Sequence, residues 1–132
     1  MTLKLNIFVV AIAVASVFSP AKADDLDSMV KKYTQESKVA PSPANGELFF
    51  SNKHGKDWSC SSCHGMPPIS EGKHVVTKKP IKPMAPAFNP ERFTDNAKVE
   101  KWFKRNCNDV LGRECVAFEK ADVLAYLSSI KK

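Results

Sequence analysis

The sequence lacks any apolar run long enough to cross a membrane. The longest, Ile7 to Ser19, falls short of the roughly 20 residues that a spanning helix needs. It follows a short segment with Lys4 and precedes Ala21-Lys22-Ala23, which has the A-x-A pattern of a signal-peptide cleavage site. These features predict a secretory signal peptide over residues 1–23, cleaved after Ala23. They also predict one periplasmic domain over residues 24–132 with no stable membrane insertion.

The chain also lacks the strong positive charge that is typical of nucleic-acid-binding proteins. Its formal net charge is +6 and falls to +4 when Lys4 and Lys22 leave with the signal peptide. This mild excess gives no reason to expect a nucleic-acid partner. Two interpretations of the lysines remain: a solvated surface, or a patch that steers an acidic redox partner.

Strand patterns are nearly absent. The longest is His74–Thr77, and no internal repeat is visible. The spacing of apolar residues instead predicts an all-α domain. The predicted helices span Asp24–Lys38, Pro43–Asn52, Thr94–Asn106 and Phe118–Ile130. Six prolines between Gly65 and Phe93 preclude a long helix there, and Asn106–Glu114 is predicted to be a loop that contains Gly112.

The helix ends and buried faces follow from the same patterns. Ser42 or Asn45 is suited to cap the second helix, and Thr94 or Asp95 the third. Gly46 allows either the close approach of another helix or an ordinary cap or loop. The expected buried residues are Val99, Trp102 and Phe103 on the third helix, and Phe118, Leu124, Leu127 and Ile130 on the last.

Only four cysteines are present, and two lie in Cys60-Ser61-Ser62-Cys63-His64. This is the C-x-x-C-H pattern of covalent haem attachment, in which Cys60 and Cys63 form thioethers and His64 binds the iron. A zinc site would need a second pair at metal spacing, and Cys107 and Cys115 are too far apart. A thioredoxin-type pair needs no following histidine and expects a βαβ context. The motif therefore predicts one covalent haem c, which leaves Cys107 and Cys115 to pair in an oxidising compartment.

A short helix that runs into this motif is typical of the class I cytochrome c fold. The second axial ligand then decides between a plain electron carrier and a gas-binding protein. Met84 stands closer to the haem histidine than the methionine ligand of this fold usually does, and its simpler role is to pack against the haem. Met66 is closer still, and His54 and His74 suit surface or propionate-side positions. Asn106 stands at the usual ligand distance, although asparagine also favours a helix C-cap.

The second half of the chain carries four distinctive motifs. They are Asn89-Pro90-Glu91-Arg92-Phe93-Thr94-Asp95, Val99-Glu100-Lys101-Trp102, Arg105-Asn106-Cys107-Asn108 and Gly112-Arg113-Glu114-Cys115. In these motifs the chain resembles the Sphaeroides haem protein family, small oxygen-binding c-type cytochromes with an asparagine axial ligand. The resemblance covers most of the predicted mature chain. It is strongest after Pro86 and weaker before Cys60, and Val116-Ala117-Phe118 is more apolar than the family's turn.

The resemblance implies a set of site residues and partners. Asn106 would bind ferric iron opposite His64 and leave on reduction, so that the ferrous haem binds O₂, NO or CO. This agrees with ligand chemistry, because a hard amide oxygen suits ferric iron better than ferrous iron. Cys107 and Cys115 would form the family's disulfide, and electrons would arrive from a dihaem cytochrome c and a membrane cytochrome b.

Two other functions stay open at this point. The chain is a plain electron-transfer cytochrome if Met84 rather than Asn106 binds the iron. It is an enzyme if it turns over a substrate as an oxygen or NO reductase or a peroxidase. The sequence places no general acid–base residue over the haem and does not decide this question.

Overall fold

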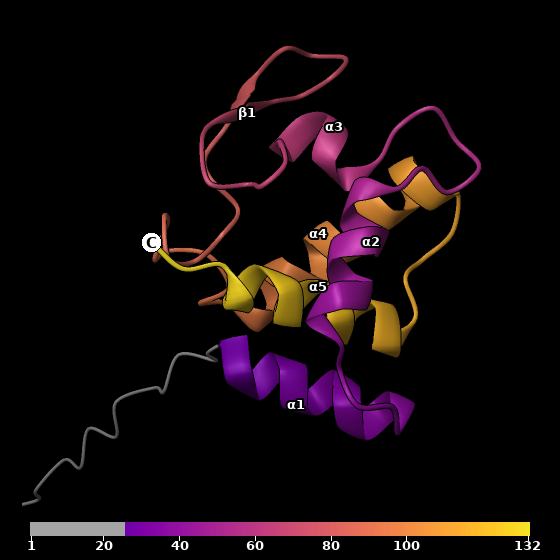
Figure 1. Ribbon diagram of the computed structural model, residues 1–132. Coiled ribbons are helices and arrows are strands. Elements are labelled where there is room, and N and C mark those ends of the chain that lie inside the picture. The colour runs from indigo at the N-terminus through magenta and orange to yellow at the C-terminus, as the bar shows by residue number, and fades with distance from the viewer. Residues whose placement is uncertain (1–25) are drawn as a thin grey trace, which may run out of the picture.

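The computed structural model describes residues 26–132, so the predicted signal peptide and its cleavage after Ala23 lie outside the described part. The elements are α1 (Leu26–Ser37), α2 (Pro43–Ser51), α3 (Cys60–His64), β1 (Gly72–Lys73), β2 (Pro80–Ile81), α4 (Asn96–Leu111) and α5 (Ala117–Ser129) (Figure 1). The predicted helical architecture is confirmed. No helix in residues 26–132 is long and apolar enough to span a membrane.

Helices α2 and α5 cross so closely that their backbones touch. Gly46 of α2 is buried, and a Cβ added there would collide with the carbonyl group of Asp122 in α5. The same aspartate accepts the Ser42 N–H at 2.7 Å through its carboxylate. The Ser42 hydroxyl caps α2 by accepting the N–H of Asn45 at 3.2 Å. Ser42 is therefore the cap, and Gly46 serves the close approach of a second helix.

The hydrophobic core consists of two clusters that meet at two phenylalanines. The first cluster contains Met29, Tyr33, Val99, Ala121 and Leu124. The second contains Phe50, Val123, Tyr126 and Leu127. Phe93 and Phe103 pack against both clusters, so side chains from the segment before α4 and from α4 itself join the two halves of the core.

Helix α4 is tied to α1 and α5 through Glu100. Lys32 of α1 donates to its carboxylate at 2.8 Å, and Lys120 of α5 donates at 3.0 Å. Burial alone would raise the pKa of Glu100, but the hydrogen bonds from these lysines outweigh it and lower the pKa to about 2. Glu100 is therefore ionised at neutral pH and bridges three helices.

Helix α4 is longer than the sequence pattern indicated. It continues to Leu111, so the prediction of a loop over Asn106–Glu114 is wrong for its first part. The apolar stripe explains the extension, because buried side chains recur at helical spacing up to the end of the helix. These side chains are Val99, Cys107 and Val110. The helix ends at Gly112, a left-handed residue with φ 77° whose N–H donates to the Asn108 carbonyl at 3.0 Å.

Two aromatic residues predicted for the core lie at the surface instead. Trp102 and Phe118 are each 44% exposed. The buried stripe of α4 includes Val99 and Cys107, which turns Trp102 outward, where the Arg105 guanidinium lies 5.5 Å from its ring centroid. The predictions for Leu124 and Leu127 of α5 are confirmed, since both are buried.

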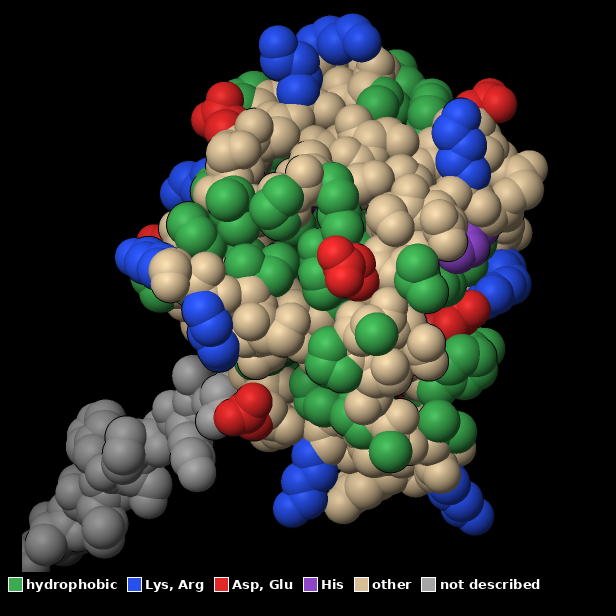
Figure 2. Space-filling model, in the orientation of Figure 1, with side chains coloured by type: hydrophobic (Ala, Val, Ile, Leu, Met, Phe, Trp, Pro, Cys, Tyr) green, Lys and Arg blue, Asp and Glu red, His purple; other side chains and the backbone are tan. Residues whose placement is uncertain are grey.

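The loop between α3 and α4 contains one small hairpin. β1 and β2 pair antiparallel, and His74–Thr77, the longest strand pattern in the sequence, forms part of the turn between them. The turn is held by His74, whose Nδ1 accepts the N–H groups of Val76 and Thr77 at 3.2 Å each. Figure 2 shows lysine and arginine side chains at the top of the molecule, where Figure 1 places this hairpin.

The closeness of α2 and α5 can be tested with Gly46→Ala. Alanine in place of glycine normally stabilises a helix by about 0.5–1 kcal/mol, but here the new methyl group meets the Asp122 carbonyl. We expect a net loss of about 1–3 kcal/mol in the free energy of unfolding, measured on the haem-loaded protein with denaturant. Asn45→Ala, on the exposed side of α2, is the control and should change stability by less than about 0.5 kcal/mol. A stabilised Gly46→Ala variant would contradict this packing.

Candidate haem site

The C-x-x-C-H motif forms a single helical turn, α3. Ser59 caps it: its hydroxyl accepts the Ser62 N–H at 3.2 Å, and its own N–H donates to the Ser62 hydroxyl at 2.9 Å. Helical spacing places Cys60 and Cys63 on the same side of this turn. Both cysteines are free thiols and are partly buried. Burial raises the pKa of the Cys60 thiol to about 11, so it is protonated at neutral pH.

His64 ends α3 and faces the apolar core. Its ring centroid lies 6.1 Å from that of Phe50, and its Nδ1 is buried without a hydrogen-bond partner in the described part of the chain. Burial, followed by the charges of Arg92 and His74, lowers the pKa of His64 to about 4. The imidazole is therefore neutral at physiological pH, which is the form that binds a metal.

The hairpin backbone packs directly on this turn. A Cβ added to Gly72 of β1 would collide with the carbonyl of Cys63 and would lie 3.0 Å from the Cα of His64. Further along, the Pro68 carbonyl accepts the N–H groups of Met84 and Ala85 at 3.1 Å each. The long loop after the motif therefore folds back over it.

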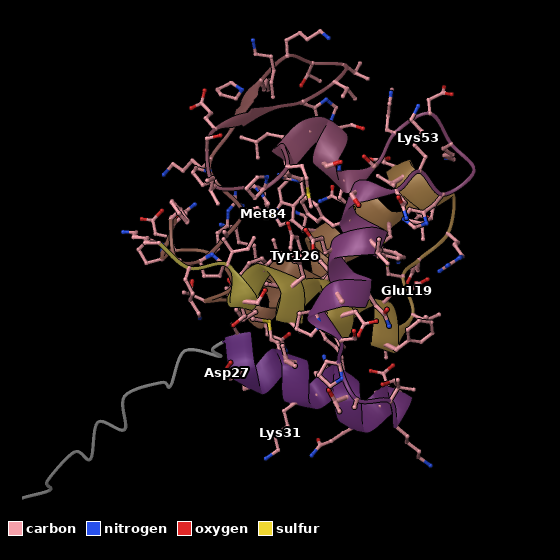
Figure 3. The ribbon with its side chains drawn as sticks, viewed as in Figure 1. Asp27, Lys31, Lys53, Met84, Glu119 and Tyr126 are labelled. Atoms are coloured by element: carbon pink, nitrogen blue, oxygen red, sulfur yellow. A yellow bond between two sulfur atoms is a disulfide. The ribbon has the colours of Figure 1, made fainter. Side chains whose placement is uncertain are left out.

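Met84 packs against a core cluster beside Cys60. Met84 and Cys60 both pack against the cluster of Phe50, Val123, Tyr126 and Leu127, and Figure 3 shows Met84 close to Tyr126. The Tyr126 hydroxyl donates to the sulfur of Met66 at 3.5 Å. The structure thus brings Cys60, His64 and Met84 together around one apolar surface.

Asn106 lies inside α4, not at its end. Gly112 is the C-cap of this helix, so the alternative interpretation of Asn106 as a C-cap is wrong. Its side chain is half-buried and makes no hydrogen bond within residues 26–132, whereas Asn108 donates to the Lys104 carbonyl at 2.7 Å. Lys56, which precedes α3, donates to the Asn108 carbonyl at 3.2 Å. This bond connects the part of α4 that carries Asn106 with the segment that enters the motif.

The two other histidines are engaged by the backbone. The Nε2 atom of His54 is 2.7 Å from the Phe49 carbonyl oxygen, and the ring centroids of His54 and Phe49 are 4.4 Å apart. His74 holds the hairpin turn through Nδ1. Each side chain therefore has a structural role, and neither needs an iron to account for its position.

Comparisons with known proteins place the chain in a family. Residues 36–127 match a family model named domain of unknown function (DUF1924). Cytochrome c'' of Methylophilus methylotrophus is 41% identical over 122 residues, which cover 85% of each chain. Cytochrome c-type protein SHP of Cereibacter sphaeroides is 45% identical over 98 residues, which cover 69% of this chain and 75% of the relative. The chain belongs to the cytochrome c'' and SHP family.

Solved structures agree with this membership. Oxidised cytochrome c'' of Methylophilus methylotrophus superposes with a TM-score of 0.75 at 42% identity, covering 81% of this chain and 95% of that one. Oxidised SHP, an oxygen-binding cytochrome c, superposes with a TM-score of 0.75 at 36% identity, covering 80% and 97%. The all-α cytochrome c fold and the resemblance to the Sphaeroides haem protein family are both confirmed.

Membership of the cytochrome c'' and SHP family implies a covalently bound haem c, and the residues of this chain fit it. Two free thiols lie at thioether spacing, and a neutral imidazole with an unpartnered buried nitrogen follows them. Cys60 and Cys63 would hold the porphyrin, and His64 would hold the iron. The Phe50 and Tyr126 cluster supplies an apolar surface beside them.

The segment after Asn106 is fixed by a disulfide and an ion pair. Cys107 and Cys115 are bonded, with their Cα atoms 5.6 Å apart. Arg113 donates to the Glu119 carboxylate at 2.6 and 2.8 Å, and Glu119 also accepts the Val116 N–H at 2.9 Å. Sequence reasoning missed this pair. Its signal was a glutamate three residues into a helix that lacks a polar cap.

Haem attachment can be tested with Cys60→Ala and Cys63→Ala. Each variant can form at most one thioether, so we expect little stable haem-loaded protein. Mass spectrometry of the exported protein should show a haem adduct on the wild type. Ser61→Ala changes a residue between the two cysteines without removing a thiol, and it should keep the full adduct. Wild-type protein that is exported and folded at the mass of the bare polypeptide would refute the site.

Proposed function

We propose that this chain is a periplasmic monohaem cytochrome c whose ferric iron is bound by His64 and Asn106. On reduction Asn106 leaves the iron, and the ferrous form then binds O₂, NO or CO. The observation that carries the proposal is the half-buried Asn106 amide without a hydrogen-bond partner in residues 26–132. Its neighbour Asn108 is bound to its own helix and serves as the comparison.

Ligand chemistry supports a bond that depends on oxidation state. When bound, the haem supplies an iron that changes oxidation state and accepts axial ligands. The amide oxygen of Asn106 is a hard, neutral and weak donor, which holds ferric iron better than the softer ferrous ion. The thioether of Met84 would have the opposite preference and would block the site in the ferrous state.

The surroundings of Asn106 support a ligand that leaves and returns. The next residue, Cys107, is bonded to Cys115, and the Arg113–Glu119 pair holds the following turn. These links anchor the end of α4 independently of any bond to iron. The Asn106 side chain can therefore move away while the helix keeps its position.

Two relatives add support from what is known of them. SHP is an oxygen-binding cytochrome c. The solution structure of Methylophilus methylotrophus cytochrome c'' addresses haem-ligand detachment. The proposal assigns both properties to one residue of this chain, Asn106.

The exposed lysines around the hairpin suggest how a partner approaches. These lysines are Lys73, Lys78, Lys79 and Lys82. Of these four lysines, Lys82 alone has a carboxylate partner in residues 26–132. That partner is Glu91, 3.5 Å away, and both side chains of the pair are exposed. We propose that this hairpin steers an acidic electron donor, a dihaem cytochrome c supplied by a membrane cytochrome b, towards the haem motif beneath Gly72.

Asn106→Ala tests the ligand. The ferric optical and paramagnetic-resonance spectra should change to those of an open or water-bound iron, and the ferrous spectra should stay nearly the same. Asn108→Ala is the matched control and should leave both states unchanged. Met84→Leu should keep the ferric ligand. Asn106→Met should favour a six-coordinate ferrous iron and weaken CO binding, if the thioether reaches the metal.

The opposite pattern would support the plain electron carrier. In that case Asn106→Ala has a wild-type ferric spectrum, and Met84→Leu loses the sixth ligand. A reductase is distinguished by sustained turnover with the reduced protein and excess O₂ or NO.

Charge reversal tests the donor surface. Lys79→Glu should slow second-order reduction by the dihaem cytochrome c at low salt, and added salt should reduce the difference. Lys31→Glu is the control, because Figure 3 places Lys31 on α1, at the opposite end of the molecule from the hairpin. Equal slowing by the control would mean that only the net charge matters.

A further inference from the structure

Arg92 is a half-buried cation without a carboxylate partner in the described part of the chain. The other two arginines are engaged elsewhere: Arg113 pairs with Glu119, and Arg105 lies over the ring of Trp102. A guanidinium taken partly out of water without an anion is unfavourable. A negatively charged group would therefore stabilise Arg92 at this position, and the described residues do not supply one.

The guanidinium is held in a defined orientation. Its Nε donates to the Pro83 carbonyl at 2.9 Å, and one terminal nitrogen donates to the Lys82 carbonyl at 2.6 Å. Asn89 donates to the same Pro83 oxygen at 3.1 Å. Since a guanidinium has five N–H donors, these two bonds leave three for another acceptor.

The segment whose Lys82 and Pro83 carbonyls accept hydrogen bonds from Arg92 lies against the haem motif. Met84 and Ala85, which directly follow the two carbonyls, donate to the Pro68 carbonyl at 3.1 Å each. Phe93, next to Arg92, packs against the same cluster as Cys60 and Met84. Two independent contacts thus place the segment that carries Arg92 beside the motif.

We propose that Arg92 binds a propionate carboxylate of the haem. The haem carries the only anions that family membership adds to this site, and guanidinium pairs with carboxylate through two parallel hydrogen bonds. The contact would also close the segment from Lys82 to Phe93 over the haem edge, because Arg92 already holds its first two carbonyls. The inference rests on the covalent haem and not on the identity of the sixth ligand.

The pair would affect the reduction potential. A fixed positive charge close to the iron disfavours the more positive ferric state. Removing it leaves the propionate charge uncompensated, so the ferric state gains and the potential falls. An exposed arginine elsewhere on the surface has little such effect, because water and salt screen its charge.

The test compares haem-loaded Arg92→Gln with Lys31→Gln, which removes one positive charge from an exposed site on α1, at the other end of the molecule from the haem motif. We expect a clear fall in midpoint potential for Arg92→Gln, a smaller fall for Arg92→Lys, and little change for Lys31→Gln. The ferric spectrum of each should keep its sixth ligand, which separates this result from a failure at Asn106. Equal shifts in the two glutamine variants, or no shift in Arg92→Gln, would overturn the proposal.

A second measurement does not depend on the glutamine variant folding. Haem labelled with ¹³C in its propionates gives isotope-shifted carboxylate bands in infrared difference spectra. In the wild type one labelled band should report an ionised carboxylate with strong hydrogen bonds. That band should move in Arg92→Lys and stay in Lys31→Gln. Identical labelled bands in wild type and Arg92→Lys would show that neither propionate contacts residue 92.

Discussion

The backbone of Gly46 lies against the carbonyl of Asp122, and this contact sets the distance between α2 and α5. The Ser42 N–H bond to the Asp122 carboxylate fixes the start of α2 at the same point. From α2 the chain passes through one loop into α3, and Phe50 at the end of α2 meets the ring of His64. The haem motif is therefore positioned by a helix crossing that involves none of its own residues.

Helix α4 depends on a different set of links. Its Glu100 bridges to Lys32 and Lys120 are partly exposed, so each contributes no more than about 1 kcal/mol. The disulfide from Cys107 to Cys115 removes roughly 2–3 kcal/mol of chain entropy from the unfolded state on the loop-closure model. The covalent link is thus the stronger one, and it lies directly beside Asn106. The strongest of these links therefore lies next to the side chain that we propose as the iron ligand.

The sequence predicted the features that depend on local pattern. C-x-x-C-H predicted three haem residues, and apolar spacing located the helices. Sequence-based prediction failed where contacts with other segments determine the structure. Helix α4 continues past Asn106 because Cys107 and Val110 are buried. Trp102 points outward, with the Arg105 guanidinium over its ring. Arg92 and Gly72 were not recognised as site residues, because only the folded loop brings them to the motif. The periodicity of apolar residues predicts local structure, and it does not predict contacts between segments that a proline-rich loop separates.

The crossing of α2 over α5 also orders the assembly of the molecule. Gly46 cannot meet Asp122 until almost the whole chain has been delivered, since the two residues lie near opposite ends of the domain. Before that moment Cys60 has no Val123, Tyr126 or Leu127 to pack against, and its thiol is open to water. After it, Cys60 packs against this cluster, and burial raises the pKa of its thiol. Docking of the last helix therefore limits access to the Cys60 side chain.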